Sequence, residues 1–143
     1  MTFWRFLLII TATSGFLAVL LGAAGSHALT PLMQTEKGPS RFDMASQYHM
    51  WHTLALLGCC TMGLGRERLA SPTSPTSKTR PFPFDLLKLA ALMFLLGIML
   101  FSGNLYLHAF QEPYALSILI PVGGIFLMSG WLMLALSVIC LEK

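Results

Sequence analysis

The chain has 143 residues, of which 55% are hydrophobic and only 10% are charged, and its formal net charge is +3. An ordinary soluble domain carries about 25% charged residues, so the composition excludes a soluble domain. It predicts one integral membrane domain over residues 1–143. The basic residues are not interleaved with aromatic residues in a groove-like pattern. This excludes nucleic acid as the expected partner and leaves the lipid bilayer.

The first predicted element is a membrane-spanning helix over residues 4–26. No acidic or basic residue occurs between Arg5 and Glu36, and about 20 apolar helical residues cross the hydrocarbon core of a bilayer. Small residues recur along one face, where they let two helix backbones approach closely. These residues are Ser14, Ala18, Gly22 and Gly25. The alternative is that small residues are simply frequent in membrane helices.

A second helix is predicted over residues 41–64. Ser40 is a suitable N-cap for it, and Gly65 is a suitable residue for its C-terminal end. Tyr48 and Trp51 fit the aromatic belt at the level of the lipid headgroups. The small residues expected to pack against neighbouring helices are Ala55 and Gly63.

The composition changes over residues 65–84, which contain a Ser-Pro-Thr repeat between basic residues. Low hydrophobicity with this much proline predicts a flexible loop. A third helix follows over residues 85–108, with Asp85 as its N-cap.

A fourth helix is predicted over residues 114–140. Pro121 near its start predicts a kink or a broken first turn. Glycines in this helix are spaced as a closely packed helix pair requires. The glycines expected at that contact are Gly123, Gly124 and Gly130. The predicted fold is therefore an all-α membrane protein with four transmembrane helices in an antiparallel up-down bundle.

Basic residues lie unequally on the two sides of this arrangement. One side holds Arg5, Arg66, Arg68, Lys78, Arg80, Lys88 and Lys143, and the other holds Lys37 and Arg41. Because cytoplasmic loops carry the excess of basic residues, both termini and the 65–84 loop are predicted to be cytoplasmic. All four histidines then fall on the outer side.

A polar cluster is expected at that outer face. Its candidate members are His27, Gln47, Tyr48, His49, His52, Asn104, Tyr106 and His108. The preferred interpretation is a hydrogen-bonded network without a cofactor. The alternative is a metal or haem site, since neutral imidazole ligates both, with His27 and His52 as the candidate ligands.

Two functions remain open besides the metal or haem site. Gly-x-Ser-x-Gly, His-Glu-x-x-His and phosphate-loop motifs are absent, and no acidic residue lies deep in a predicted span. These features favour a non-enzymatic accessory or assembly subunit of a membrane complex. Binding of a lipid or quinone, or transport of a small molecule, between the helices at the outer end is a second possibility. Hydrolysis by Ser26 or Ser102 with a histidine is disfavoured, because Ser26 and His27 point about 100° apart on a helix.

Four stretches together resemble the family known as domain of unknown function 423. They are GAAGSHAL, RFDMASQYHMWHTLALL, FSGNLYLHAF and IPVGGIFLMSGWLMLAL. Members of this family are small four-helix membrane proteins of bacteria, with mitochondrial transmembrane protein 256 as a relative. The resemblance implies four helices and a location in the inner membrane, but no agreed activity.

The family motifs fall on a defined set of positions in this chain. They are Gly22, Gly25, His27, Tyr48, His52, Ser102, Gly103, Tyr106, Pro121, Gly123, Gly124, Gly130 and Trp131. His49 and His108 lie where the resemblance does not require histidine. Replacing His52 is therefore expected to impair the protein more than replacing His49.

Overall fold

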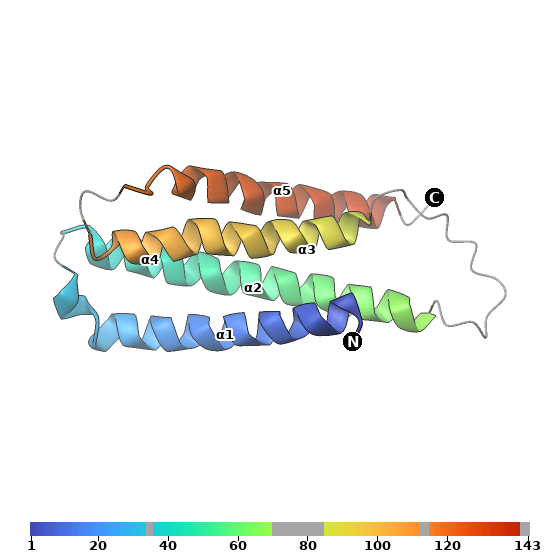
Figure 1. Cartoon of the computed structure of the whole chain (residues 1–143), viewed down its shortest axis with the longest axis horizontal. Helices are drawn as coiled ribbons and strands as arrows, with labels where there is room; N and C mark the ends of the chain where they lie inside the picture. Colours follow the sequence, from blue (N-terminus) through green and yellow to red (C-terminus); the bar gives the residue numbers. More distant parts are fainter. Residues whose placement is uncertain (34–35, 70–84, 112–114, 141–143) are drawn as a thin grey trace.

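The described residues are mostly helical and form no strand. The structure, a computed structural model, describes residues 1–33, 36–69, 85–111 and 115–140. Its elements are α1 (Phe3–His27), the 3₁₀ helix η1 (Thr30–Leu32), α2 (Gly38–Leu69), α3 (Leu86–Gly97), the π-helical segment η2 (Ile98–Gly103), α4 (Asn104–His108) and α5 (Leu119–Ile139). Since α3, η2 and α4 follow without a break, residues 86–108 form one continuous helical stretch (Figure 1). The all-α prediction is confirmed for these residues.

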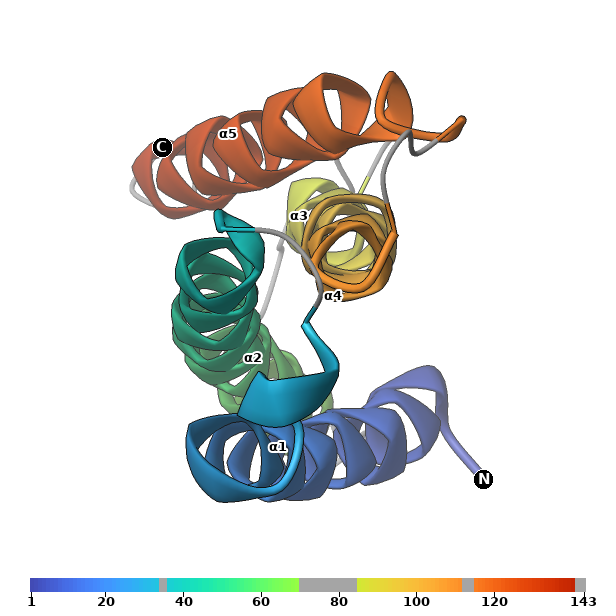
Figure 2. The same ribbon diagram turned by 90° about the vertical axis from the view of Figure 1, so that its left-hand side faces the viewer.

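The long helices lie side by side, and each reverses the direction of the one before it (Figure 1). The first turn of α1 and the last turn of α5 consequently lie at the same end of the molecule. Viewed from the opposite end, α1 rests against α2, while α5 covers α3 (Figure 2). The main helix contacts are therefore α1 with α2, α2 with α3, and α3 with α5.

Within the described residues, three helical stretches are long and apolar enough to cross a membrane. They are Phe3–His27, Leu86–His108 and Leu119–Ile139. Large apolar side chains on their outer faces stay exposed, including Phe16 at 66% and Met128 at 66%. Such faces would be unfavourable in water and are suited to lipid. The more polar helix α2 does not meet the same criterion.

Helix α2 is longer than predicted at both ends. It begins at Gly38 rather than at residue 41, and it continues beyond Gly65 to Leu69. Pro39 is tolerated because the N–H groups of a first helical turn have no intrahelical partner. Residues 70–84 of the predicted flexible loop lie outside the described residues.

Helix α5 begins later than the predicted start at residue 114. Its first residue is Leu119, after turns over residues 115–118. This start puts Pro121 in the first turn, where a missing N–H costs no hydrogen bond. At the start of α3, the Asp85 carboxylate accepts a hydrogen bond from the Lys88 backbone N–H at 3.3 Å. The predicted Asp85 cap is thus confirmed.

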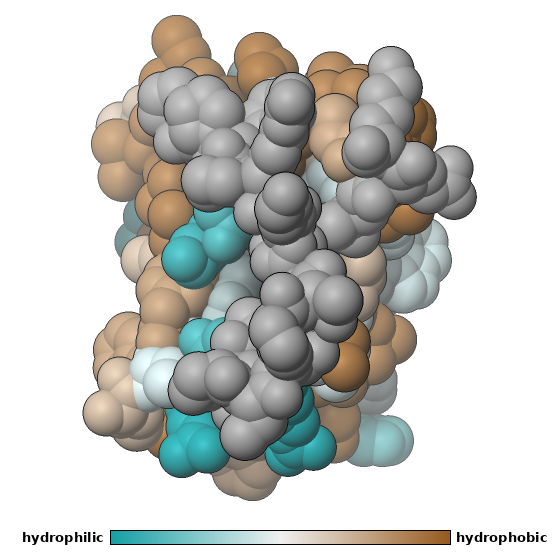
Figure 3. Space-filling model, turned by 90° about the vertical axis from the view of Figure 1, so that its right-hand side faces the viewer, coloured by the Kyte–Doolittle hydropathy of each residue, from teal (hydrophilic) through white to brown (hydrophobic). Residues whose placement is uncertain are grey.

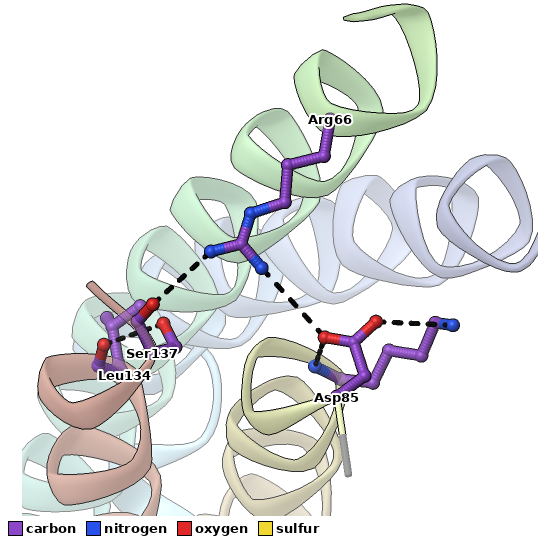
Figure 4. A network of polar contacts seen from close by, with 5 residues as sticks. Arg66, Asp85, Leu134 and Ser137 are labelled. Atoms are coloured by element: carbon purple, nitrogen blue, oxygen red, sulfur yellow. Dashed lines mark hydrogen bonds and ion pairs between the residues drawn. The ribbon is translucent and has the colours of Figure 1, made fainter. Parts of the chain in front are cut away.

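Arg66, near the C-terminal end of α2, contacts the adjacent ends of α3 and α5 (Figure 4). Its guanidinium donates to the Ser137 carbonyl near the C-terminal end of α5 at 3.4 Å. It also lies 3.9 Å from the Asp85 carboxylate at the start of α3. A cation near a helix C-terminus and an anion near a helix N-terminus are each stabilised by the helix dipole. Figure 3 looks onto this end, where hydrophilic residues lie beside apolar flanks.

Glycines allow several of the helix contacts to be close. An added Cβ would collide with Trp4 at Gly63, with Phe42 at Gly25 and with the Phe94 ring at Gly130. These contacts join α1 to α2 at both ends and α3 to α5. Close approach of this kind gains dispersion energy, which must hold helices together where surrounding lipid is equally apolar.

The other predicted packing residues have varied surroundings. Ser14, Ala18 and Gly123 are buried, and Ala55 is half-buried against the core. A Cβ at Gly22 would meet no atom within 4 Å, and one at Gly124 would make an ordinary contact at 3.8 Å. Room for a side chain at these two positions means that close packing does not require glycine there.

Candidate functional site

A hydrogen-bonded network crosses the molecule from α1 through α2 to α4. Ser14 Oγ of α1 lies 3.0 Å from His49 Nε2 and 2.8 Å from Thr53 Oγ1, both of α2. His49 Nδ1 lies 3.4 Å from the Tyr106 hydroxyl of α4. Tyr106 in turn donates to Ser46 Oγ at 3.3 Å. His49 is therefore the residue that links the three helices.

The direction of these hydrogen bonds follows from the last of them. Because the Tyr106 hydroxyl donates to Ser46, the Nδ1–H of His49 must donate to the Tyr106 oxygen. A neutral imidazole has one N–H, so His49 Nε2 accepts from the Ser14 hydroxyl. Thr53 then donates to Ser14. The hydrogen positions are assigned here from the bonding partners. In this assignment the hydroxyl protons of Thr53, Ser14 and Tyr106 are each donated to a partner within the network.

His52 faces a different part of the molecule. Its ring packs near Tyr48, Phe94 and Trp131, with ring centroids 5.7, 5.9 and 6.2 Å away. Its Nδ1–H donates to the Tyr48 carbonyl at 2.7 Å. His52 thus belongs to the packed region between α2, α3 and α5, whereas His49 faces α1 and α4.

A cleft of about 440 Å³ lies between α1 and the 86–108 stretch, with His49 of α2 also in its wall. The cleft exists because α1 packs mainly against α2 and makes few contacts with the 86–108 stretch (Figure 2). Its lining is mostly apolar, with Ile9, Leu17 and Met99 among the residues. The described side chains that line it include no Asp, Glu, Lys or Arg.

The polar lining residues come from three elements. They are Thr13 and Ser14 of α1, His49 of α2, and Ser102 and Tyr106 of the 86–108 stretch. A mostly apolar cleft with a few converging polar groups is typical of sites for small molecules. The arrangement therefore has the features of a binding site.

The π-helical segment η2 forms part of the cleft wall through Ser102 and Gly103. Ser102 is only 1% exposed, and its hydroxyl has no hydrogen-bond partner among the described residues. Within the same segment the Leu100 carbonyl accepts from the Asn104 side-chain amide at 2.8 Å. Short π-helical turns inside α-helices occur frequently at functional sites. The presence of η2 in the cleft wall therefore supports a functional role for the cleft.

The predicted polar cluster is divided in the structure. His49 and Tyr106 meet, but His27 and Gln47 are exposed. His27 lies about 20 Å further along α1 than Ser14, the α1 residue that reaches His49. The structure therefore does not bring the four histidines together at one face.

The remaining predicted members lie elsewhere. Asn104 is buried at the junction of η2 and α4, and His108 is half-buried at the end of α4, where its carbonyl accepts from Arg41 at 3.5 Å. His27 and His52, the candidate metal ligands, lie at the exposed end of α1 and in the packed interior. In the described ranges, no three His, Cys, Asp or Glu side chains are grouped to hold a metal ion.

Several residues of the site are not identified from the sequence. Thr53, Ser46 and Thr13 belong to no recognised motif, and Ser14 is expected only as a small packing residue. Hydroxyl side chains in membrane helices commonly bond to their own backbone. Their spacing alone therefore does not show which of them face a neighbouring helix.

Comparison with known proteins places the chain among membrane proteins without an assigned activity. The model of the family "Protein of unknown function (DUF423)" matches residues 21–124. The UPF0382 inner membrane protein YgdD of Escherichia coli K12 is 34% identical over 140 residues, covering 97% of this chain and 93% of that protein. A UPF0382 membrane protein of Haemophilus influenzae is 32% identical over 128 residues, covering 90% and 89%.

A more distant relative extends the same comparison. A UPF0382 membrane protein of Staphylococcus epidermidis is 30% identical over 130 residues, covering 91% of this chain and 92% of that protein. No solved structure matches the chain significantly.

Proposed function

Because the chain belongs to the DUF423 family of membrane proteins, we propose that it crosses a bacterial inner membrane four times and binds a small amphipathic molecule without transforming it. The molecule occupies the cleft between α1 and the 86–108 stretch. The observation that carries this proposal is the cleft itself, with apolar walls and polar groups from three elements.

The four crossings are supported by how α2 lies between apolar neighbours. Three stretches are long and apolar enough to span a bilayer, and α2 runs alongside them in the opposite direction to α1 (Figure 1). His49, His52 and Thr53 of α2 face other helices and are buried. A polar residue inside a membrane is tolerated when it faces the protein interior in this way.

Fusions to a reporter enzyme test the proposed topology. Alkaline phosphatase, which is active only in the periplasm, should be inactive when fused after Lys143, because both termini are proposed to be cytoplasmic. The same enzyme fused after Lys37, between α1 and α2, should be active. Activity after Lys143 with silence after Lys37 would reverse the orientation. Activity at both positions would contradict the four crossings.

Filling the cleft tests the proposed binding. Gly103 lines the cleft, and a Cβ there would meet no atom within 4 Å. Gly103→Leu should therefore place its side chain in the cleft and reduce any co-purifying small molecule at least tenfold, as measured by native mass spectrometry after mild detergent extraction. Gly58→Leu is the matched control, because Gly58 is exposed on α2 and also has free space around it.

The two leucine variants should show the same thermal unfolding profile if both tolerate the side chain. Equal retention of the bound molecule by both variants would contradict binding in the cleft. Loss from both would instead point to a general effect of substituting glycine. A wild-type protein that carries no small molecule, even when lipid extract is supplied, would refute the proposed function.

A role as an accessory or assembly subunit is the second candidate. It is supported by α1, which is held mainly by α2 and exposes large side chains such as Phe16 and Val19, at 66% and 61%. A partner helix could pack on this exposed face. The same native spectra test the idea, since a partner of defined mass should remain in a fixed ratio to the wild-type chain. Release of that partner by Val19→Asn, with no loss of the small molecule, would separate the two functions.

A further inference from the structure

One residue in the cleft wall has a buried hydroxyl proton that no described group uses. The protons of Thr53, Ser14, His49 and Tyr106 all serve the network between the helices. Thr13 donates to the Ile9 carbonyl of its own helix at 3.0 Å. Ser102 alone among these polar lining residues has a buried hydroxyl without a partner. A buried donor left unpaired costs about 1–3 kcal/mol, so a molecule that supplies an acceptor oxygen there would be favoured.

The position of Ser102 in the membrane restricts the charge of that molecule. Ser102 precedes His108, the end of α4, by six residues, which is about 9 Å along the helix. Because no described cationic side chain lines the cleft, a phosphate or carboxylate would be buried there without compensation. Such burial costs far more than burial of a carbonyl, which favours a neutral head.

The walls of the cleft restrict the rest of the molecule. Ile9 and Met99 lie on opposite sides of it and are 57% and 63% exposed, so the cleft opens toward the lipid-facing surface between them. A volume of about 440 Å³ lies in the range of about 300–1,000 Å³ typical of small-molecule sites. It can enclose a compact head while an apolar tail continues between the helices into the bilayer.

We infer that the cleft binds an isoprenoid quinone, with one head carbonyl accepting the hydrogen bond of Ser102 and the tail leaving between Ile9 and Met99. This inference rests on the cleft-binding function proposed above and adds the chemical class of the ligand. A quinone combines the three required features, since its head is neutral, carries carbonyl acceptors and is attached to an apolar tail. No electron transfer is included, because binding alone satisfies the unpaired hydroxyl.

Binding of decylubiquinone tests the inference. Native mass spectrometry of the full chain should show one molecule of decylubiquinone bound per chain, with palmitate bound much more weakly. Ser102→Ala should weaken decylubiquinone binding about threefold to tenfold, the effect of one lost hydrogen bond. Thr61→Val is the matched control. Its hydroxyl already donates to the Gly58 carbonyl at 2.9 Å, and it does not line the cleft, so binding should be unchanged.

The outcomes separate this inference from the broader proposal. Equal binding of decylubiquinone and palmitate, or equal effects of Ser102→Ala and Thr61→Val, would overturn the quinone assignment. If the quinone assignment failed but Gly103→Leu prevented the binding of palmitate or a co-purifying lipid, the cleft would remain a binding site with a different ligand. Binding of decylubiquinone that Gly103→Leu does not affect would overturn both. Thermal unfolding of each variant, measured without added lipid, identifies any that fails to fold.

Discussion

Gly123→Ala should destabilise the protein by about 3 kcal/mol, the upper part of the usual range for an overfilled contact. An added Cβ would lie 2.7 Å from the Leu100 carbonyl carbon and 2.8 Å from the Phe101 Cα. Both atoms belong to the backbone of η2, so no side-chain rotation can relieve the collision, and α5 must move away from η2. Thermal unfolding in a mild detergent, followed by circular dichroism, measures the loss.

Gly124→Ala provides a control one residue further along the same helix. A Cβ there would lie 3.8 Å from the Phe101 ring, which is an ordinary contact. Alanine also favours a helix over glycine by about 1 kcal/mol, so this variant should be as stable as the wild type or slightly more stable. Similar losses from both substitutions would mean that α5 does not approach η2 as closely as the structure has it.

His52→Ala should also destabilise the protein by about 3 kcal/mol. The substitution removes a buried ring from between Tyr48, Phe94 and Trp131, and large-to-small changes in a packed interior commonly cost about 2–5 kcal/mol. The cost arises because the neighbouring rings can only partly close the space. Thermal unfolding under identical detergent conditions measures the effect.

His49→Ala is the matched comparison for this second substitution. His49 borders the cleft instead of filling a packed interior, and the bonds of Ser14 to Thr53 and of Tyr106 to Ser46 remain without it. Its loss should cost only about 2 kcal/mol, because it removes two hydrogen bonds with a usual net value of about 1 kcal/mol each. Equal losses of stability from the two histidine substitutions would contradict their assignment to different environments.

Much of the fold can be predicted from composition and local chemistry. Long apolar stretches without charge predict α1, the 86–108 stretch and α5, because such segments are stable as helices in lipid. Asp85 identifies the start of α3 through the ordinary preference for a carboxylate at an N-cap. The late start of α5 is less predictable, since Pro121 is compatible with either a kink or a first-turn position.

The site could not be predicted in the same way. His49 and His52 are three residues apart and share a broad helix face, yet one contacts α1 and α4 while the other contacts α3 and α5. Which helix covers each part of that face depends on packing among all the helices. The cleft similarly depends on α1 leaving one side of the assembly uncovered, and no local pattern encodes a space between two helices.

The π-helical segment sets the rotational phase of the two halves of the third long helix. Each residue turns an α-helix by about 100°, and the wider hydrogen-bonding turn of a π-helix absorbs about one additional residue. Upstream, Phe94 faces α5 and His52; downstream, Tyr106 faces Ser46 and His49. If Ile98–Gly103 formed a regular α-helix instead, Tyr106 would point about 100° away from its present direction. The six residues of η2 therefore let the interior half and the cleft-lining half of one helix be oriented independently.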